Sequence, residues 1–323
     1  MIQQSVRKQR RRAALALGGG GARGLAHLGV VEVLRQTPIH IERIVGVSIG
    51  SLAGALCAVD EDVVGMQKRV IKYLTSKAFN ERQASLFAAA PPAEEPSTSG
   101  MFAWYEQIKR YLGARRQMMH LLRKPSLLSA TVIQAVIDAL LPDIDIRDTR
   151  IPLSIVALDL YRGRPVVLER GPMKDAVMAS AAIPGVFPPV EMDGMLLCDI
   201  GLMDSLPTKY AAQRASDLAI AVNVGSHLER IKSCQTAAEI FLRLSDIGEH
   251  LVRDYTRVLA DLEIVPKVSE RPWFDFRDPE SLIESGRVAA RKAVCSTELL
   301  PPPRFCRTDL RADQITPRVD PLP

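Results

Sequence analysis

The fold is decided by residues 13–50, which read AALALGGGGARGLAHLGVVEVLRQTPIHIERIVGVSIG. The short apolar run 13–17 ends in four glycines and predicts a buried strand that enters a loop with accessible backbone. Residues 25–34 carry an apolar side chain at every third position, which predicts an amphipathic helix. A second buried strand is predicted at 44–47 and a helix of small residues at 51–59. This order indicates an α/β fold with parallel strands and helices on the faces of the sheet.

The rest of the chain continues this pattern as one domain, with no internal repeat and no second boundary. The expected elements are hairpin strands at 153–158 and 166–168, strands at 196–198 and 218–224, a long helix at 236–262, a strand at 263–268 and a helix at 280–294. We therefore predict a single domain over residues 13–300, preceded by a basic leader at 1–12 and followed by a Pro-rich tail at 301–323.

Residues 84–122 interrupt the regular pattern. Prolines and small polar residues up to residue 100 predict a mobile loop. The stretch 101–122 is rich in aromatic residues and methionine and is broken by arginines, so it suits a lid or a membrane-facing helix, although apolar residues at this spacing also suit a core helix.

The charge of the chain is concentrated at its start. The net charge at pH 7 is +5, and Arg7, Lys8, Arg10, Arg11 and Arg12 supply five positive charges before any acid occurs. The remaining 37 basic residues balance 37 acids. A basic leader on a neutral body predicts no nucleic-acid partner but allows peripheral contact with an anionic membrane; a solvated, disordered leader is the alternative.

The cysteines and the hydropathy indicate a cytoplasmic protein, peripheral at the membrane at most. Five cysteines without a C-x-x-C pair predict neither a disulfide framework nor a zinc site. No apolar stretch approaches the roughly 20 residues that cross a bilayer. No feature of the sequence indicates an oligomeric state.

The motif Gly46-Val47-Ser48-Ile49-Gly50 lies between a predicted strand and a predicted helix. A G-x-S-x-G motif in this position forms a sharp turn that exposes the serine, and it needs glycines where side chains would collide. The helix N-terminus favours the negative charge that develops during nucleophilic attack. A strand-to-helix turn with Ser48 as a capping residue is the structural alternative.

The glycine loop, Gly18 to Gly24, also follows a strand and opens a helix. Its backbone N–H groups can converge on an anionic oxygen, either a phosphate or the oxyanion of an acyl-transfer intermediate. The spacing Gly19-x-Gly21-x-x-Gly24 satisfies the dinucleotide fingerprint, but Glu42 precedes the second strand instead of following it. A nucleotide-cofactor enzyme is therefore kept as an alternative hypothesis.

A nucleophilic serine needs a base, and the residues alone leave this choice open. His227 is the only histidine well placed for the chain order of α/β-hydrolases. An aspartate can act instead if it accepts the serine proton directly, and Asp199 follows a predicted strand, with Asp193 and Asp204 as nearby competitors.

Four blocks of sequence resemble the patatin-like phospholipase family in their order along the chain. They are Gly19-Gly20-Gly21-Ala22-Arg23-Gly24, Gly46-Val47-Ser48-Ile49-Gly50, Ala179-Ser180-Ala181-Ala182-Ile183-Pro184-Gly185-Val186-Phe187-Pro188-Pro189 and Asp199-Ile200-Gly201. The chain looks most like the compact bacterial members, and the likeness extends from about residue 13 to about residue 293.

The resemblance implies a three-layer α/β/α sandwich with a mostly parallel sheet and a Ser–Asp dyad, without a catalytic histidine, a metal or another cofactor. It implies Ser48 as nucleophile, Asp199 as its partner, and Gly19, Gly20, Gly21 and Arg23 as the oxyanion hole. The implied substrates are carboxylic esters of phospholipids or lysophospholipids, cleaved through an acyl-enzyme intermediate.

One position departs from the family pattern. Ile200 stands where the family usually has glycine after the aspartate, and a β-branched residue does not adopt a positive φ without strain. If the turn needs a left-handed residue here, Asp199 is displaced. Because the flanking residues through Leu206-Pro207 still fit the family pattern, an intact dyad is expected. This departure motivates a further alternative, a catalytically impaired regulatory or binding protein on the same scaffold.

Overall fold

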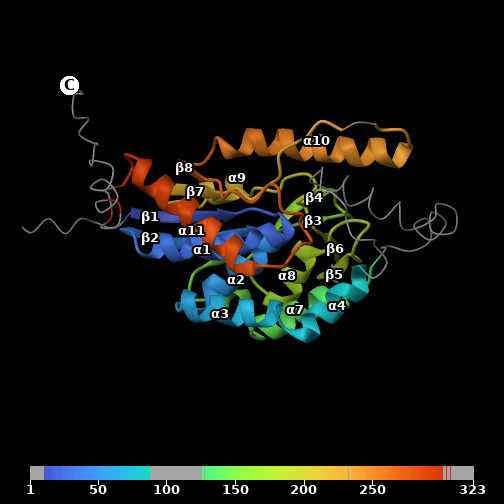
Figure 1. Cartoon of the computed structure of the whole chain (residues 1–323), viewed down its shortest axis with the longest axis horizontal. Coiled ribbons are helices and arrows are strands. Elements are labelled where there is room, and N and C mark those ends of the chain that lie inside the picture. Colours follow the sequence, from blue (N-terminus) through green and yellow to red (C-terminus); the bar gives the residue numbers. More distant parts are fainter. Residues whose placement is uncertain are drawn as a thin grey trace, which may run out of the picture.

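A computed structural model describes residues 11–87, 126, 128–231, 233–300, 303 and 306 of the chain. In this part of the chain, a central sheet of eight strands lies between two layers of helices (Figure 1). The predicted three-layer α/β/α architecture is therefore confirmed.

The sheet is mostly parallel. Its strands are β1 (Arg11–Leu17), β2 (Ile39–Val47), β3 (Leu153–Asp159), β4 (Arg164–Leu168), β5 (Val190–Met192), β6 (Met195–Cys198), β7 (Leu218–Val222) and β8 (Leu262–Ile264). The strand order is β5-β6-β3-β2-β1-β7-β8, and β4 pairs with β3 outside this path. The pairs β1/β2, β2/β3, β1/β7 and β7/β8 are parallel, whereas the pairs of β3 with β4, β3 with β6 and β5 with β6 are antiparallel.

The central strand β1 shows why both faces of the sheet are buried. Side chains alternate between the two faces of a strand, so Leu15 and Leu17 enter the larger apolar core while Ala14 and Ala16 enter the smaller one. A parallel strand covered by helices on both faces reads as a continuous apolar run, which is what this sequence contains.

The two helical layers differ in size (Figure 1). The larger layer contains α1 (Ala26–Arg35), α2 (Ile49–Val59), α3 (Val63–Leu74), α4 (Lys77–Phe87), α7 (Thr131–Leu140), α8 (Met173–Ala181) and α11 (Pro279–Ser296). The smaller layer contains α9 (Thr208–Ala212) and the long α10 (Ala237–Arg257). Short 3-10 helices occur at Gly21–Leu25 and Ile146–Asp148.

Most predicted elements are present, with shifted bounds. The predicted helix at 236–262 ends at Arg257, and β8 has three residues where six were predicted. The glycine loop turns first into a 3-10 helix and only then into α1. Residues 84–87 belong to α4, whereas we expected a loop there; residues 88–122, the leader up to residue 10 and most of the tail lie outside the described residues.

The cysteines correct one expectation. Cys295 and Cys306 form a disulfide with a Cα–Cα distance of 5.6 Å, although the cysteine pattern predicted none. Cys57, Cys198 and Cys234 are free. Within the described ranges, no helix has the length and apolar character needed to span a bilayer.

Helices α1 and α11 cross at a contact that requires glycine on both sides. A Cβ atom at Gly29 would overlap the backbone of Ile283, and one at Gly286 would overlap the backbone of Ala26. The two backbones therefore approach more closely than any side chain would allow. This contact holds α11 against the helix that follows the glycine loop.

We expect Gly29→Ala to lower the free energy of unfolding by about 1–3 kcal/mol, because the added methyl group forces the two helices apart. Urea unfolding followed by circular dichroism would measure the change. Gly248→Ala is the matched control: no atom lies within 4 Å of a Cβ built there, so alanine should raise the stability by up to about 1 kcal/mol. Equal effects of the two substitutions would contradict this interpretation of the crossing.

Candidate active site

Ser48 occupies the sharp turn between β2 and α2. Its backbone has φ 55° and ψ −127°, a conformation that costs a non-glycine residue of the order of 1–3 kcal/mol. A Cβ at Gly46 would overlap the backbone of Gly50, and a Cβ at Gly50 would overlap the backbone of Leu17. Both flanking glycines are thus required sterically, as expected for a turn of this type.

A buried serine on another element holds this turn in place. Ser180, near the end of α8, accepts a hydrogen bond from the Ser48 N–H at 2.9 Å and donates one to the carbonyl of Val156 on β3 at 2.7 Å. The sequence alone gives Ser180 no separate role; it lies within the block of residues 179–189. Its position among alanines at the end of a buried helix was the available signal, since a buried hydroxyl there needs a partner.

Asp199 lies directly after β6 and meets Ser48. Both side chains line the polar pocket, the Ser48 hydroxyl lies close enough to the Asp199 carboxylate to lower its pKa, and the Gly201 N–H donates to Asp199 Oδ1 at 2.7 Å. The Asp199 N–H donates to the carbonyl of Ala182 at 2.9 Å, which fixes the backbone. Burial raises the pKa of Asp199 to about 6, although the nearby Ser48 hydroxyl and the Gly201 N–H lower it. The structure therefore brings the two residues together from positions far apart in the sequence.

Ile200 does not displace Asp199. Among the described residues, a positive φ at a non-glycine position occurs at Ser48, Asp193 and Asp278, and Ile200 is not one of them. Its side chain is 2% exposed and belongs to the smaller core, on the face of the sheet that α9 covers. The position therefore needs an apolar side chain and no left-handed backbone.

The other candidate bases do not line the pockets at Ser48. Asp193 occupies the turn between β5 and β6, and neither Asp193 nor Asp204 lines a pocket with Ser48. None of the described residues that line the pockets at Ser48 is a histidine, and His227 is thus outside them. His27 lies behind the glycine loop, where its Nε2 is 2.8 Å from the carbonyl of Gly18, and burial lowers its pKa to about 4.

The glycine loop is anchored by its own amides. The N–H of Gly19 donates to the carbonyl of Ser205 at 2.8 Å, and the N–H of Ala22 donates to the carbonyl of Trp273 at 2.6 Å. Gly20 and Gly21 lie between these two anchors, and both line a pocket with Ser48. The amide of Gly19 is thus engaged with the protein, whereas Gly20 and Gly21 form the part of the loop between the two anchors, at the polar pocket.

Arg23 stabilises the glycine loop through a hydrogen bond to its backbone. It is 5% exposed, and its Nε donates to the carbonyl of Gly20 at 3.0 Å. Its Nη1 has no hydrogen-bond partner in the described part of the chain. Burial lowers the pKa of Arg23 to about 10, with a further contribution from the nearby Arg253, and the side chain stays positively charged at neutral pH.

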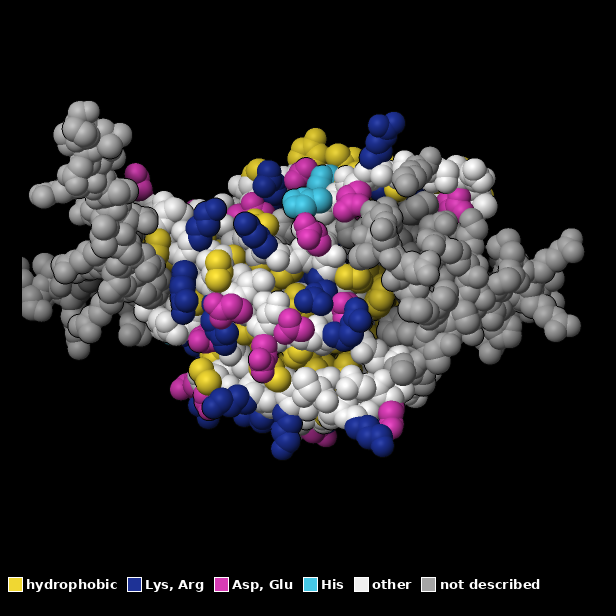
Figure 2. Space-filling model, viewed as in Figure 1, with side chains coloured by type: hydrophobic (Ala, Val, Ile, Leu, Met, Phe, Trp, Pro, Cys, Tyr) yellow, Lys and Arg dark blue, Asp and Glu magenta, His cyan; other side chains and the backbone are white. Residues whose placement is uncertain are grey.

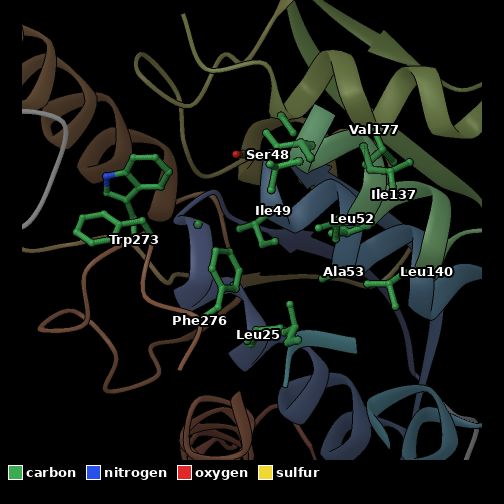
Figure 3. A pocket seen from close by; sticks show the side chains of 18 of the residues that line it. Leu25, Ser48, Ile49, Leu52, Ala53, Ile137, Leu140, Val177, Trp273 and Phe276 are labelled. Atoms are coloured by element: carbon green, nitrogen blue, oxygen red, sulfur yellow. The ribbon is translucent and has the colours of Figure 1, made fainter. Parts of the chain in front are cut away.

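Two pockets of opposite character meet at Ser48. The apolar pocket has an empty volume of about 1140 Å³ and runs along α2, with walls from α3, α7 and α8. Figure 3 shows Trp273 and Phe276 on one side of it and Ile137 and Leu140 on the other. The polar pocket, of about 680 Å³, is lined by Asp199, the glycine loop and charged residues of α10.

A hydrogen-bond network ties α10 to the polar pocket. The hydroxyl of Ser205 donates to Glu249, and Arg253 Nη1 donates to Glu249 Oε1 at 3.0 Å. Arg253 Nη2 also donates to the carbonyl of Ser226 at 2.6 Å. Since the carbonyl of Ser205 receives the Gly19 amide, this network positions the glycine loop as well. Sequence reasoning did not find it, because its members are spread over three segments.

A strained serine, a buried carboxylate and a glycine-rich loop line the same pocket, an arrangement that suits acyl transfer. No cluster of His, Cys, Asp or Glu side chains suited to a metal ion occurs among the described residues. A sequence profile described as patatin-like phospholipase matches residues 15–212, more than half of the chain. The chain belongs to this family.

The chain is similar to known proteins over part of its length, and it spans about half or less of the length of the curated relatives it matches. It is 34% identical over 219 residues to an uncharacterised NTE family protein of Mycobacterium tuberculosis, covering 66% of this chain and 49% of that protein. It is 30% identical over 216 residues to a lysophospholipase of Aspergillus fumigatus, covering 67% of this chain and 12% of that protein. A crystal structure of VipD from Legionella pneumophila covers 88% of this chain and 66% of that chain, with a TM-score of 0.43 and 13% identity.

We expect Ser180→Ala to lower the free energy of unfolding by about 1–3 kcal/mol, because the Ser48 N–H and the Val156 carbonyl both lose their partner. Relaxation of the turn should also slow the reaction of Ser48 with a fluorophosphonate. Urea unfolding and labelling kinetics measure the two effects. Ser154→Ala is the control, since the buried hydroxyl of Ser154 on β3 bonds Glu169 and not the turn; equal slowing by both variants would argue against a positioning role of Ser180.

Proposed function

We propose that the protein is a serine hydrolase that cleaves carboxylic esters of phospholipids or lysophospholipids, with Ser48 as nucleophile and Asp199 as base. The observation that carries this proposal is that the strained Ser48 and the buried Asp199 line one polar pocket, at its junction with an apolar pocket, with Ser48 close enough to lower the pKa of Asp199. A carboxylate with a pKa near 6 is ionised at neutral pH and is a stronger base than an ordinary aspartate.

The first half of the reaction forms an acyl-enzyme. The Ser48 oxygen attacks the ester carbonyl carbon while its proton passes to Asp199. The carbonyl oxygen becomes an oxyanion, which the amides of Gly20 and Gly21 and the N-terminus of α2 would stabilise. When the intermediate collapses, the C–O bond to the alcohol breaks and Asp199 returns the proton to the departing alkoxide.

The second half releases the acid. Asp199 takes a proton from a water molecule, whose oxygen attacks the acyl carbon, and the second tetrahedral intermediate collapses with return of the proton to the Ser48 oxygen. Gly19 was predicted as a third oxyanion donor. In this scheme its amide instead anchors the loop, because it donates to the carbonyl of Ser205. The charge of Arg23 would add electrostatic stabilisation beneath Gly20.

The two pockets indicate how such a substrate would lie. The apolar pocket offers a continuous hydrocarbon lining that begins at Ser48 and suits an acyl chain. The polar pocket suits the alcohol side of the ester, which in a lysophospholipid carries the headgroup. The similarity to a fungal lysophospholipase agrees with this substrate class.

No specific contact supports the two alternative functions, a nucleotide-cofactor enzyme and a catalytically impaired binding protein. The glycine loop uses amides on the carbonyls of Val222, Ser205 and Trp273, so fewer remain for a dinucleotide phosphate. Ile200, which motivated an impaired protein, fits without moving Asp199. The cytoplasmic location stays a prediction, and the Cys295–Cys306 disulfide is a feature more common in oxidising compartments.

Ser48→Ala and Asp199→Asn should each lower hydrolysis of lysophosphatidylcholine and p-nitrophenyl butyrate by at least about 10²-fold to 10⁴-fold, because each removes a member of the dyad. A fluorophosphonate should label the unaltered protein at Ser48, as located by peptide mapping. Asp204→Asn is the matched control: burial also raises the pKa of Asp204 to about 6, yet Asp204 lines neither pocket. Full activity of the Ser48→Ala protein, or labelling elsewhere, would refute the assignment.

The pH profile should report the raised pKa of Asp199. As the base must be ionised, kcat/KM should rise with pH and level off above about 6, with a tenfold fall for each unit below. The same group links stability to pH: its folded pKa lies above the unfolded value of 3.8, so its contribution is complete below 3.8 and is lost as the pH rises through about 6.

Asp199→Asn should therefore be more stable than the unaltered protein at pH 7, by at most about 3 kcal/mol, since it removes a buried charge and keeps an acceptor for Gly201. Urea unfolding at pH 4 and pH 7 measures this difference, which should shrink at the lower pH. A plateau of kcat/KM that begins near pH 4 would show that Asp199 has an ordinary pKa.

A further inference from the structure

The outward face of α10 carries the largest concentration of exposed apolar side chains among the described residues. Eight of the fifteen exposed large hydrophobic residues lie on this helix or at its C-terminal end. We call them the outer stripe: Ile240, Phe241, Leu244, Leu251, Val252, Tyr255, Val258 and Leu259. Figure 2 shows yellow side chains along the upper edge of the molecule, where Figure 1 places α10.

The stripe is too exposed to be part of the core. Phe241, Tyr255 and Val258 are 71%, 79% and 72% exposed. Together the eight residues expose on the order of 800 Å², whereas the largest apolar patch on a typical monomer covers roughly 300–600 Å². An apolar patch of this size on one helix indicates a surface that a lipid layer or another molecule covers.

The opposite face of α10 fixes the orientation of the stripe. Leu242 packs against the small apolar cluster of Val186 and Phe187, and Arg253 is 5% exposed, with hydrogen bonds to Glu249 and Ser226. Rotating the helix to bury the stripe would expose this cluster and break these bonds. The orientation of the helix is therefore fixed, with Leu242 and the residues of the polar pocket facing inward and the stripe facing outward.

The inward face of α10 is a wall of the polar pocket. Ser245, Asp246, Glu249 and Arg253 line this pocket together with Ser48. One helix thus separates the pocket from the stripe. If the stripe rests on a lipid layer, the pocket lies within a helix diameter, about 10–12 Å, of that layer.

The charges on the stripe suit a neutral lipid surface. Between the first and last stripe positions α10 and its end carry three basic and three acidic residues, namely Arg243, Arg253, Arg257, Asp246, Glu249 and Asp254. Arg253 pairs with Glu249 at 3.0 Å and Arg257 with Asp254 at 3.2 Å. The stripe thus has no excess of positive charge to attract anionic lipid. Aromatic and aliphatic side chains on an amphipathic helix that lies flat enter the boundary between headgroups and acyl chains.

A second copy of the chain fits the stripe less well. Phe241, Gly248 and Tyr255 are seven residues apart, as are Leu244, Leu251 and Val258, which is the spacing of a helix pair. The middle position of the first series is glycine, with nothing within 4 Å of a Cβ built there. Two such helices packed together would leave a gap at the centre of their seam, whereas fluid acyl chains fill any shape.

We propose that the outer stripe of α10 docks the protein onto a surface of zwitterionic or neutral lipid, with the polar pocket held beside that surface. The use of this docking for catalysis rests on the proposed function, but the binding itself does not. It differs from the expected contact of the basic leader with anionic membranes, because it needs no net charge and should not weaken with salt.

The test is sedimentation of the full chain with phosphatidylcholine vesicles. Replacing Phe241, Leu244, Leu251 and Tyr255 with glutamine, a good helix former, should lower the partition coefficient at least about tenfold at both low and high salt. A control protein carries Val64→Gln, Tyr161→Gln and Val288→Gln, three exposed apolar residues on other elements, and should bind as the unaltered protein does. Circular dichroism would verify that all variants keep the fold.

Three outcomes would overturn the proposal. The first is unchanged vesicle binding by the α10 variant. The second is binding that occurs only with anionic vesicles and disappears on deletion of residues 1–12. The third is a dimer in light scattering that the α10 substitutions dissociate, because the stripe would then pair two copies. Fluorophosphonate labelling of Ser48 is measured on the same protein preparations in the absence of vesicles. Labelling without vesicle binding would mean that the docking proposal fails, whereas vesicle binding without labelling would mean that the proposed function fails.

Discussion

The site depends on one local constraint, the backbone of Ser48 held at positive φ between β2 and α2. This conformation is unfavourable by itself and persists only because the surroundings enforce it. Glycines at 46 and 50 remove the steric obstacle, and Ser180 fastens the Ser48 amide to the neighbouring strand. The strain places the Ser48 hydroxyl above the end of the sheet, where Asp199 arrives from β6.

Burial determines the pKa of Asp199, the second residue of the site. Asp199 is enclosed by the antiparallel side of the sheet and by the segment around Ala182, so its charge is poorly solvated and its pKa rises. The Ser48 hydroxyl and the Gly201 amide are the groups that offset this desolvation. In the proposed reaction, a proton that passes from Ser48 to Asp199 would remove this buried charge, which would make the transfer easier than it is in water.

Much of this could be predicted from the sequence, because it depends on short segments. The glycines at 46 and 50 and the strands before Ser48 and Asp199 are visible in a few consecutive residues. The support from Ser180, the Glu249–Arg253 pair and the Cys295–Cys306 disulfide could not be predicted, since each joins residues that only the fold brings together. Whether position 200 needs a left-handed backbone could not be predicted either, because the local backbone decides it.

The polar pocket connects the segment that the family profile matches, residues 15–212, to the rest of the chain. The family profile ends at residue 212, yet the carbonyl that holds Gly19 belongs to Ser205, whose hydroxyl binds Glu249 on α10. A displacement of α10 would therefore be transmitted through Ser205 to the glycine loop beside Ser48. The same helix faces outward with its apolar stripe, so contact with a surface on one side and the geometry of the loop on the other are carried by a single rigid element.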